Sequence, residues 1–177
     1  MEINEYRQLK AFAVQDGTFL GLIWVACFAS FIGQLKDPSF SFLWMVLSVF
    51  SVGFAFIRVK KFGKKVRGGD LPFSNAWMYA ITMIVCACLL MAISNYLYFA
   101  YIDKGFVAGT YINIFESEES QAVIKAYKID AKTFNEAVKM MAAMSPMDWT
   151  LNILSTNMTV GLIASPLIAL YARGRKQ

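Results

Sequence analysis

The chain has 177 residues, of which 58% are hydrophobic and 16% are charged, and its formal net charge is +5. A soluble domain is typically about 45–50% apolar and about 25% charged, so this composition excludes an ordinary soluble domain and a disordered chain. The sequence contains no histidine. Its absence excludes catalysis by a histidine acid, base or triad member, and it excludes histidine-ligated metal sites.

Four stretches of the chain run without a charged residue for about the length of a membrane span. They are 19, 20, 32 and 24 residues long and cover 17–35, 38–57, 71–102 and 149–172. A helix needs about 20 residues to cross a hydrocarbon core of about 30 Å. The sequence therefore predicts a single membrane domain over residues 1–177, with spans at about 17–35, 38–57, 75–101 and 147–172.

The ends of the spans carry helix-start signals. Ser145, Pro146 and Asp148 are an N-cap, a first helical residue and a first-turn acid for the fourth span. Before the first span, the apolar residues of segment 1–16 recur at roughly helical spacing, which favours a short interfacial helix that runs into the span.

Residues 103–146 form a long loop between the third and fourth spans, and their pattern predicts two amphipathic helices outside the membrane. The first is expected at about Glu118–Tyr127. The second starts at Asp130 as N-cap, with Ile129 and Phe134 placed as a hydrophobic staple. The predicted fold class is thus all-α: an integral membrane four-helix bundle with an extracytoplasmic amphipathic helical insertion between helices 3 and 4.

Positive charge is concentrated on one side of the predicted membrane. Segment 58–70 has a net charge of +5 and segment 173–177 has +3, whereas the loop 103–148 has −2. With four spans, both basic segments and the N-terminus share one side. Cytoplasmic loops are enriched in Lys and Arg, so we expect a multi-pass protein of the bacterial cytoplasmic (inner) membrane with both termini inside.

The basic segment after the second span is the most prominent feature outside the spans. Its positive residues are Arg58, Lys60, Lys61, Lys64, Lys65 and Arg67. One interpretation is a topology determinant that contacts anionic lipid headgroups, at about 1 kcal/mol for each charge near the surface. The other is a docking site for an anionic ligand or a cytoplasmic partner. No nucleic-acid-binding motif accompanies the segment, so nucleic acid is not an expected partner.

Polar residues within the predicted spans are few. Toward the outer halves of the third and fourth spans lie Ser94, Asn95, Asn152 and Asn157. We interpret them as interhelical contacts, which contribute about 0.6 kcal/mol on average in membranes, with a polar substrate path as the alternative. The apolar cores contain no Asp, Glu, Lys or Arg, which argues against a proton-coupled pump. We expect no catalytic residue, cofactor or metal.

Three short motifs resemble those of a known family. They are Gly17-x-x-x-Gly21 at the entry to the first span, the basic loop that ends Gly68-Gly69 before Leu71-Pro72-Phe73-Ser74, and the segment 95–103 at the exit of the third span. The chain resembles the uncharacterised bacterial membrane family called "domain of unknown function 4199". The resemblance implies four spans with an outer helical insertion, and it implies no activity.

These observations favour a non-enzymatic inner-membrane scaffold or partner subunit, because no catalytic constellation is present and the basic loop suits docking. Through the genes that often neighbour such proteins, the resemblance suggests a polyprenyl-phosphate glycosyltransferase as the kind of cytoplasmic membrane-associated enzyme that would dock. Two alternatives remain. One is a small transporter or channel component that uses the polar groups of the third and fourth spans. The other is a lipid-handling enzyme with Asp70, Asp103 or Asp148 as acid–base groups.

Overall fold

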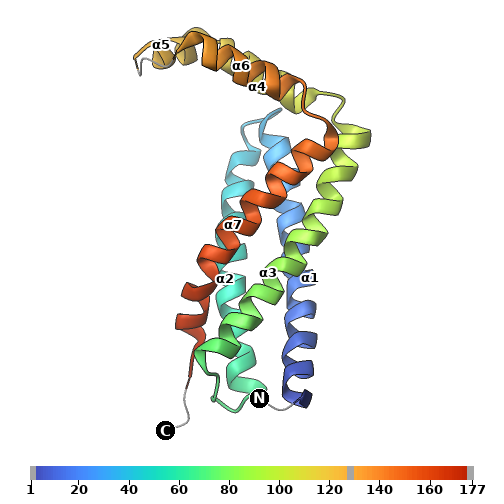
Figure 1. The fold of residues 1–177 in the computed structure, drawn as a ribbon, viewed down its shortest axis with the longest axis vertical. Coiled ribbons are helices and arrows are strands. Elements are labelled where there is room, and N and C mark those ends of the chain that lie inside the picture. Colours follow the sequence, from blue (N-terminus) through green and yellow to red (C-terminus); the bar gives the residue numbers. More distant parts are fainter. Residues whose placement is uncertain (1–2, 127–129, 175–177) are drawn as a thin grey trace. The chain divides into compact units, whose positions relative to one another are not determined.

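The computed structural model describes residues 3–126 and 130–174, and helices make up most of them. Its helices are α1 (Ile3–Gln34), α2 (Phe40–Lys65), α3 (Phe73–Leu97) continued by the π-helical turn η1 (Tyr98–Ile102), α4 (Phe106–Glu116), α5 (Glu118–Ala126), α6 (Ala131–Ala142) and α7 (Pro146–Ala172) (Figure 1). Four segments are long and apolar enough to cross a membrane: α1, α2, α3 with η1, and α7. The predicted all-α class and the four spans are confirmed.

The starts of α7 and α1 both agree with the sequence signals. At α7, the Asp148 amide donates to Ser145 Oγ at 3.2 Å, and the Ser145 amide donates to Asp148 Oδ2 at 2.9 Å. This reciprocal pair is a capping arrangement for the first turn. Residues 3–16, expected as an interfacial helix, are one continuous helix with the first span, because nothing between Ile3 and Gln34 interrupts the backbone ladder.

The chain divides into two compact units. The first, which we call the four-helix unit, comprises residues 1–94 and 152–177 and holds α1, α2, most of α3 and most of α7. The second, which we call the connecting unit, comprises residues 95–151 and holds the end of α3, η1, α4 to α6 and the start of α7.

In the four-helix unit, α1 and α3 approach each other at two glycines. A Cβ added to Gly17 would lie 2.6 Å from the Met83 carbonyl oxygen, and one added to Gly21 would lie 2.9 Å from Leu90 Cδ2. The core beside this contact includes Ala80 and Met83, both with no exposed surface. Small residues four apart allow this close backbone contact in a membrane, so the Gly17-x-x-x-Gly21 pair packs within the chain.

A proline inside α7 is accommodated by a side-chain hydrogen bond. Pro166 has no amide proton, so the Leu162 carbonyl loses its ordinary helical donor. The Ser165 hydroxyl donates to that carbonyl at 2.8 Å and accepts the Trp77 indole N–H at 2.9 Å. This chain of two hydrogen bonds satisfies the free carbonyl and ties α7 to α3.

In the connecting unit, an aspartate starts α4. Asp103 accepts the amides of Gly105 and Val107 at 3.0 and 3.1 Å, and Gly105 has a φ of 82°, a left-handed conformation that suits glycine. The ring of Phe99 stacks on Trp149 with centroids 5.5 Å apart. Asp130 caps α6 as predicted, since its carboxylate accepts the Thr133 amide at 3.0 Å.

The prediction of two helices for this loop missed α4. The described residues between η1 and α7 form three helices, and α4 precedes the segment expected as the first. The α4 sequence contains β-branched residues and Gly109, which are weak helix formers, so its helical state depends on packing more than on local propensity. Tyr127 and Ile129 lie outside the described residues, and so does the expected staple.

Candidate functional site

A buried charged cluster joins three of the four spanning helices. Asp16 of α1 is only 1% exposed. Its Oδ1 accepts the Arg58 Nε–H of α2 at 2.8 Å and forms an ion pair with Arg58 Nη2. Its Oδ2 accepts the Tyr79 hydroxyl of α3 at 2.5 Å. Both carboxylate oxygens are therefore engaged, which a buried carboxylate requires to offset its loss of hydration.

The helices place this cluster through their core contacts. Asp16 precedes Gly17, so the close approach of α1 to α3 brings the carboxylate toward Tyr79. The Phe62 ring of α2 packs on Tyr79 with centroids 4.6 Å apart. An aromatic cover lowers the local dielectric and strengthens the charge pairing. The cluster acts as an electrostatic clamp between α1, α2 and α3.

Sequence reasoning did not predict this contact: Asp16 counted only as the charge before the first apolar stretch, and Arg58 was assigned to the basic segment that contacts anionic lipid or a partner. The sequence does contain an indication of this ion pair, because Asp16 comes directly before the first apolar stretch and Arg58 directly after the second. In two antiparallel neighbouring helices these positions lie at the same level of the bundle. Opposite charges at such matched ends favour an ion pair, so the sequence contained a signal for this contact.

The structure distributes the basic residues of segment 58–67 among different contacts. Arg58 is held by Asp16, and Arg67 Nη1 forms an ion pair with Glu5 Oε1 at 2.7 Å. Lys60 Nζ lies 4.3 Å from the centroid of the Tyr171 ring, a cation–π contact. The remaining three, all exposed and with no ion pair in the part of the chain that the structure describes, are Lys61, Lys64 and Lys65.

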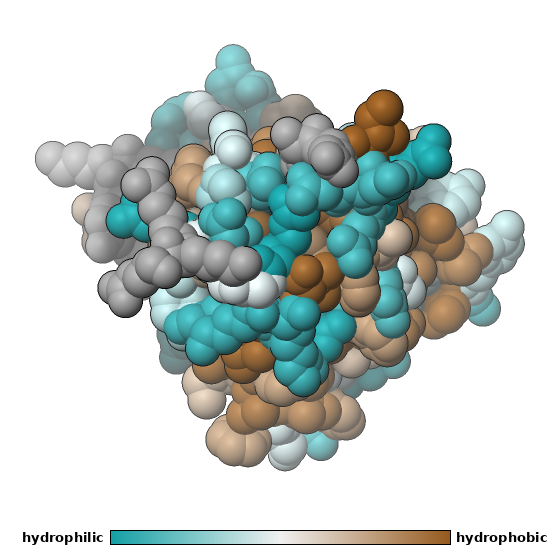
Figure 2. Space-filling model, turned by 90° about the horizontal axis from the view of Figure 1, so that it is seen from below, coloured by the Kyte–Doolittle hydropathy of each residue, from teal (hydrophilic) through white to brown (hydrophobic). Residues whose placement is uncertain are grey.

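The backbone that follows α2 is fixed by hydrogen bonds. The Gly69 amide donates to the Gly63 carbonyl at 3.0 Å. Leu71 and Gly174 exchange two backbone hydrogen bonds, at 2.9 and 3.1 Å. Figure 2 looks onto this end of the four-helix unit and shows hydrophilic residues gathered on it, with some hydrophobic residues among and beside them. The basic segment is thus a supported surface of the four-helix unit.

The four predicted polar contacts have different environments. Asn157 of α7 donates from Nδ2 to Met91 Sδ of α3 at 3.2 Å, so it does join the two helices. Ser94 donates to the Leu90 carbonyl of its own helix at 3.2 Å. Asn95 is fully buried, and its amide has no hydrogen-bond partner among the described atoms. Asn152 is exposed.

A cavity of about 410 Å³ lies in the four-helix unit, and sequence reasoning did not anticipate it. Its lining is mostly apolar and aromatic, with three polar residues: Trp24, Cys27, Phe28 and Phe31 of α1; Trp44, Ser48, Ser51 and Val52 of α2; Met91 of α3; Ile153, Asn157 and Val160 of α7. A second cavity of about 140 Å³ shares five of these residues, among them Trp24 and Asn157, and continues to Phe56 and Ile168. We call the two together the α2–α7 groove.

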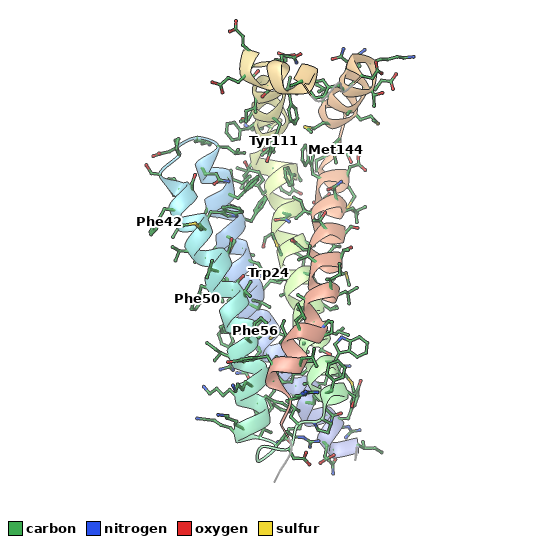
Figure 3. All side chains as sticks on the ribbon, turned by 90° about the vertical axis from the view of Figure 1, so that its left-hand side faces the viewer. Trp24, Phe42, Phe50, Phe56, Tyr111 and Met144 are labelled. Carbon is green, nitrogen blue, oxygen red and sulfur yellow. The ribbon has the colours of Figure 1, made fainter. Side chains whose placement is uncertain are left out.

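The opposite face of α2 carries large apolar side chains that the bundle does not cover. Phe42 and Phe50 project from α2 away from the other helices (Figure 3), with 69% and 56% of their surface exposed. In a spanning helix such a face meets lipid. Among the described residues, no group of three His, Cys, Asp or Glu side chains is arranged to hold a metal ion.

Four apolar helices of spanning length define a multi-pass α-helical membrane protein, and the buried ion pair and the glycine contact join three of them. A family model described as "Protein of unknown function (DUF4199)" matches residues 15–173, so the chain belongs to this family, as its motifs suggested. No curated protein and no solved structure matches the chain.

Proposed function

We propose that the protein is a non-enzymatic scaffold or partner subunit of the bacterial cytoplasmic membrane. In this proposal both termini are cytoplasmic, and the protein docks a membrane-associated protein through the basic end of α2. The observation that carries the proposal is the face formed by Lys61, Lys64 and Lys65, which we call the lysine face. These residues are exposed and have no carboxylate partner among the described residues.

The lysine face is preorganised. Residues three and four apart lie on one side of a helix, so the three side chains leave the last two turns of α2 on the same side. The surrounding contacts of Arg58 and Arg67 hold that turn against α1. A rigid cationic surface loses less conformational entropy on binding than a flexible one, and it steers an acidic partner toward the correct orientation.

The expected partner therefore carries an acidic surface close to the membrane. A cytoplasmic membrane-associated enzyme such as a polyprenyl-phosphate glycosyltransferase is one example that the family context suggests. The helix-cap roles of Asp103 and Asp148 support the non-enzymatic assignment, because both carboxylates are occupied by amides or hydroxyls of their own segments.

The test is purification of the full chain from native membranes in mild detergent, followed by quantitative identification of bound proteins. We expect one protein at near-stoichiometric amount, lost when the lysine face is reversed by K61E, K64E and K65E. The matched control replaces the same lysines by arginine and retains the partner, because the charge is kept. Absence of any near-stoichiometric protein, or equal retention by the Glu variant, contradicts the proposal.

One observation favours a small transporter or channel component as the second candidate. Asn157 lies in the wall of the α2–α7 groove and donates to Met91, which lines the same wall. If the groove is a path for a polar solute, N157L abolishes transport of that solute into reconstituted vesicles and changes the thermal stability of the protein little. Vesicles that move no more solute with the wild-type chain than without it remove this candidate.

A further inference from the structure

The wall of the α2–α7 groove on α2 follows a single line of side chains. Trp44, Ser48, Val52 and Phe56 line the two cavities and are spaced by four residues. Residues four apart stack along one face of a helix. Each step of four residues also turns by about 40° around the helix, so the line winds around α2. Continued along the sequence it reaches Lys60 and, one turn further, Lys64, so a mostly apolar strip ends near two cations.

The facing wall on α7 ends at the same level. Ile168 lines the groove and Tyr171 follows three residues later. The Tyr171 ring contacts Phe56 edge-on with centroids 5.3 Å apart, and Lys60 Nζ lies 4.3 Å from its centroid. Phe56, Tyr171 and Lys60 therefore form the end of the groove that carries the basic segment.

The groove is lined mainly by apolar side chains and contains few polar atoms. The hydroxyls of Ser48 and Ser51 donate to carbonyls of their own helix, at 2.7 and 2.8 Å. The Asn157 amide nitrogen is directed to Met91 Sδ. With these donors already engaged and the rest of the lining apolar, the groove suits an apolar chain better than a polar solute, because a polar solute would lose more hydration than the few remaining acceptors could replace.

The length of the groove matches one membrane leaflet. Trp44 and Phe56 are twelve residues apart, about 18 Å along a helix that rises about 1.5 Å per residue. Half of a hydrocarbon core of about 30 Å is about 15 Å. An acyl chain that lies along the strip therefore brings its headgroup to the level of Lys60 and Lys64.

We propose that the α2–α7 groove binds one acyl chain of an anionic phospholipid, with the lipid phosphate at Lys60 and Lys64. The two cations at the end of an apolar strip supply the charge complementarity for this occupant and for the leaflet on the side of the basic segment. A spanning helix from a second copy of this chain is the competing occupant. The proposal does not depend on the protein partner proposed above, and its test uses the purified chain alone.

The test uses Trp24 and Trp44, which line the groove, as reporters. The full chain is reconstituted in neutral phosphatidylcholine that contains a minor fraction of phosphatidylglycerol with brominated acyl chains, which quench nearby indoles. We expect stronger quenching than with the same fraction of brominated phosphatidylcholine. Each lysine is expected to raise the binding preference for the anionic lipid over the neutral lipid about fivefold. K60Q with K64Q reduces the preference to that of the neutral lipid.

The matched control is K61Q with K65Q, which removes the same charge from positions off the strip and keeps most of the preference. Native mass spectrometry of the same variants counts the anionic lipids that remain bound. S48F, which fills the groove, loses the bound lipid even with both lysines present. Three outcomes overturn the proposal: quenching that only follows the lipid fraction, equal loss in the control pair, or concentration-dependent disulfide cross-linking of two chains through V52C.

Discussion

The α1–α3 side and the α2–α7 side of the four-helix unit are made of similarly apolar helices, yet they are buried to different degrees. In the most apolar 18-residue stretch, 44% of α1 and 39% of the α3–η1 span are buried, against 11% of α2 and 22% of α7. On the first side, a Cβ at Gly17 would collide with the α3 backbone. On the second, α2 and α7 line a groove together with residues of α1 and Met91 of α3.

The difference follows from the absence of a hydrophobic driving force between helices inside a membrane. Lipid tails are as apolar as leucine, so helices associate through close packing and polar contacts. The α1–α3 side has both, in Gly17 and in the Asp16–Tyr79 hydrogen bond. At Gly53 of α2, a Cβ would have no described neighbour within 4 Å, so a glycine by itself does not draw two helices together.

The largest effect is expected when the buried ion pair is broken. R58L leaves Asp16 buried and uncompensated, and we expect a loss of about 3–5 kcal/mol in the free energy of unfolding. The control is R67Q, which breaks the more exposed pair with Glu5 and costs at most about 1 kcal/mol. Equilibrium unfolding in mixed micelles measures both.

The double variant D16L with R58L distinguishes the loss of the ion pair from the cost of burying an unpaired charge. Two apolar residues leave no buried charge, so we expect most of the stability lost in R58L to return. An R58L variant no less stable than R67Q would show that the Asp16 ion pair does not hold the α1–α3 side to α2.

The next largest effect is expected from replacing a glycine by alanine, which adds one methyl group to α1 or to α2. G17A places a Cβ 2.6 Å from the Met83 carbonyl oxygen, and we expect a cost of about 1–3 kcal/mol from the resulting backbone shift. G53A meets open space and is expected to be neutral or stabilising, because alanine favours a helix over glycine by up to about 1 kcal/mol. Thermal unfolding in the same detergent compares them, and equal midpoints would refute the contrast.

A smaller effect concerns the link between the two sides. S165A removes the hydroxyl between the Trp77 indole and the Leu162 carbonyl, and we expect a loss of about 1 kcal/mol. T156A is the control, since that exposed hydroxyl bonds only a carbonyl of its own helix. A red shift or broadening of the tryptophan emission in S165A but not T156A is the accompanying signature; identical spectra and midpoints would argue against the link.

The smallest effect lies in the connecting unit, where a single exposed carboxylate caps α6. The Thr133 amide and hydroxyl lower the pKa of Asp130 below its ordinary value of about 3.9. A lowered folded-state pKa contributes stability that is present above the ordinary value and is lost as the pH falls through the folded one. Hydrogen exchange of α6 amides, corrected for intrinsic rates, should therefore accelerate below about pH 4, and D130N should flatten this dependence. A pH dependence that persists in D130N assigns it to another group.

Local signals predicted the elements well and their contacts poorly. The four spans follow from charge-free length, and the start of α7 follows from Ser145, Pro146 and Asp148, because these features act within a few residues. The α4 helix was missed because its residues lack strong helix propensity. The interhelical role expected for Asn157 appears, but through Met91, since the rotation of each helix decides which side chains meet.

By itself the sequence determined an all-α chain with four spanning helices, because hydrocarbon length and the need to satisfy backbone hydrogen bonds leave no other solution for such long apolar stretches. Only the tertiary structure decided that Asp16, Arg58 and Tyr79 meet, and that α2 and α7 leave a groove that ends at Lys60. These features depend on how each helix is turned about its own axis. In an apolar span that rotation is set by side-chain packing between distant segments, which hydropathy along the chain does not record.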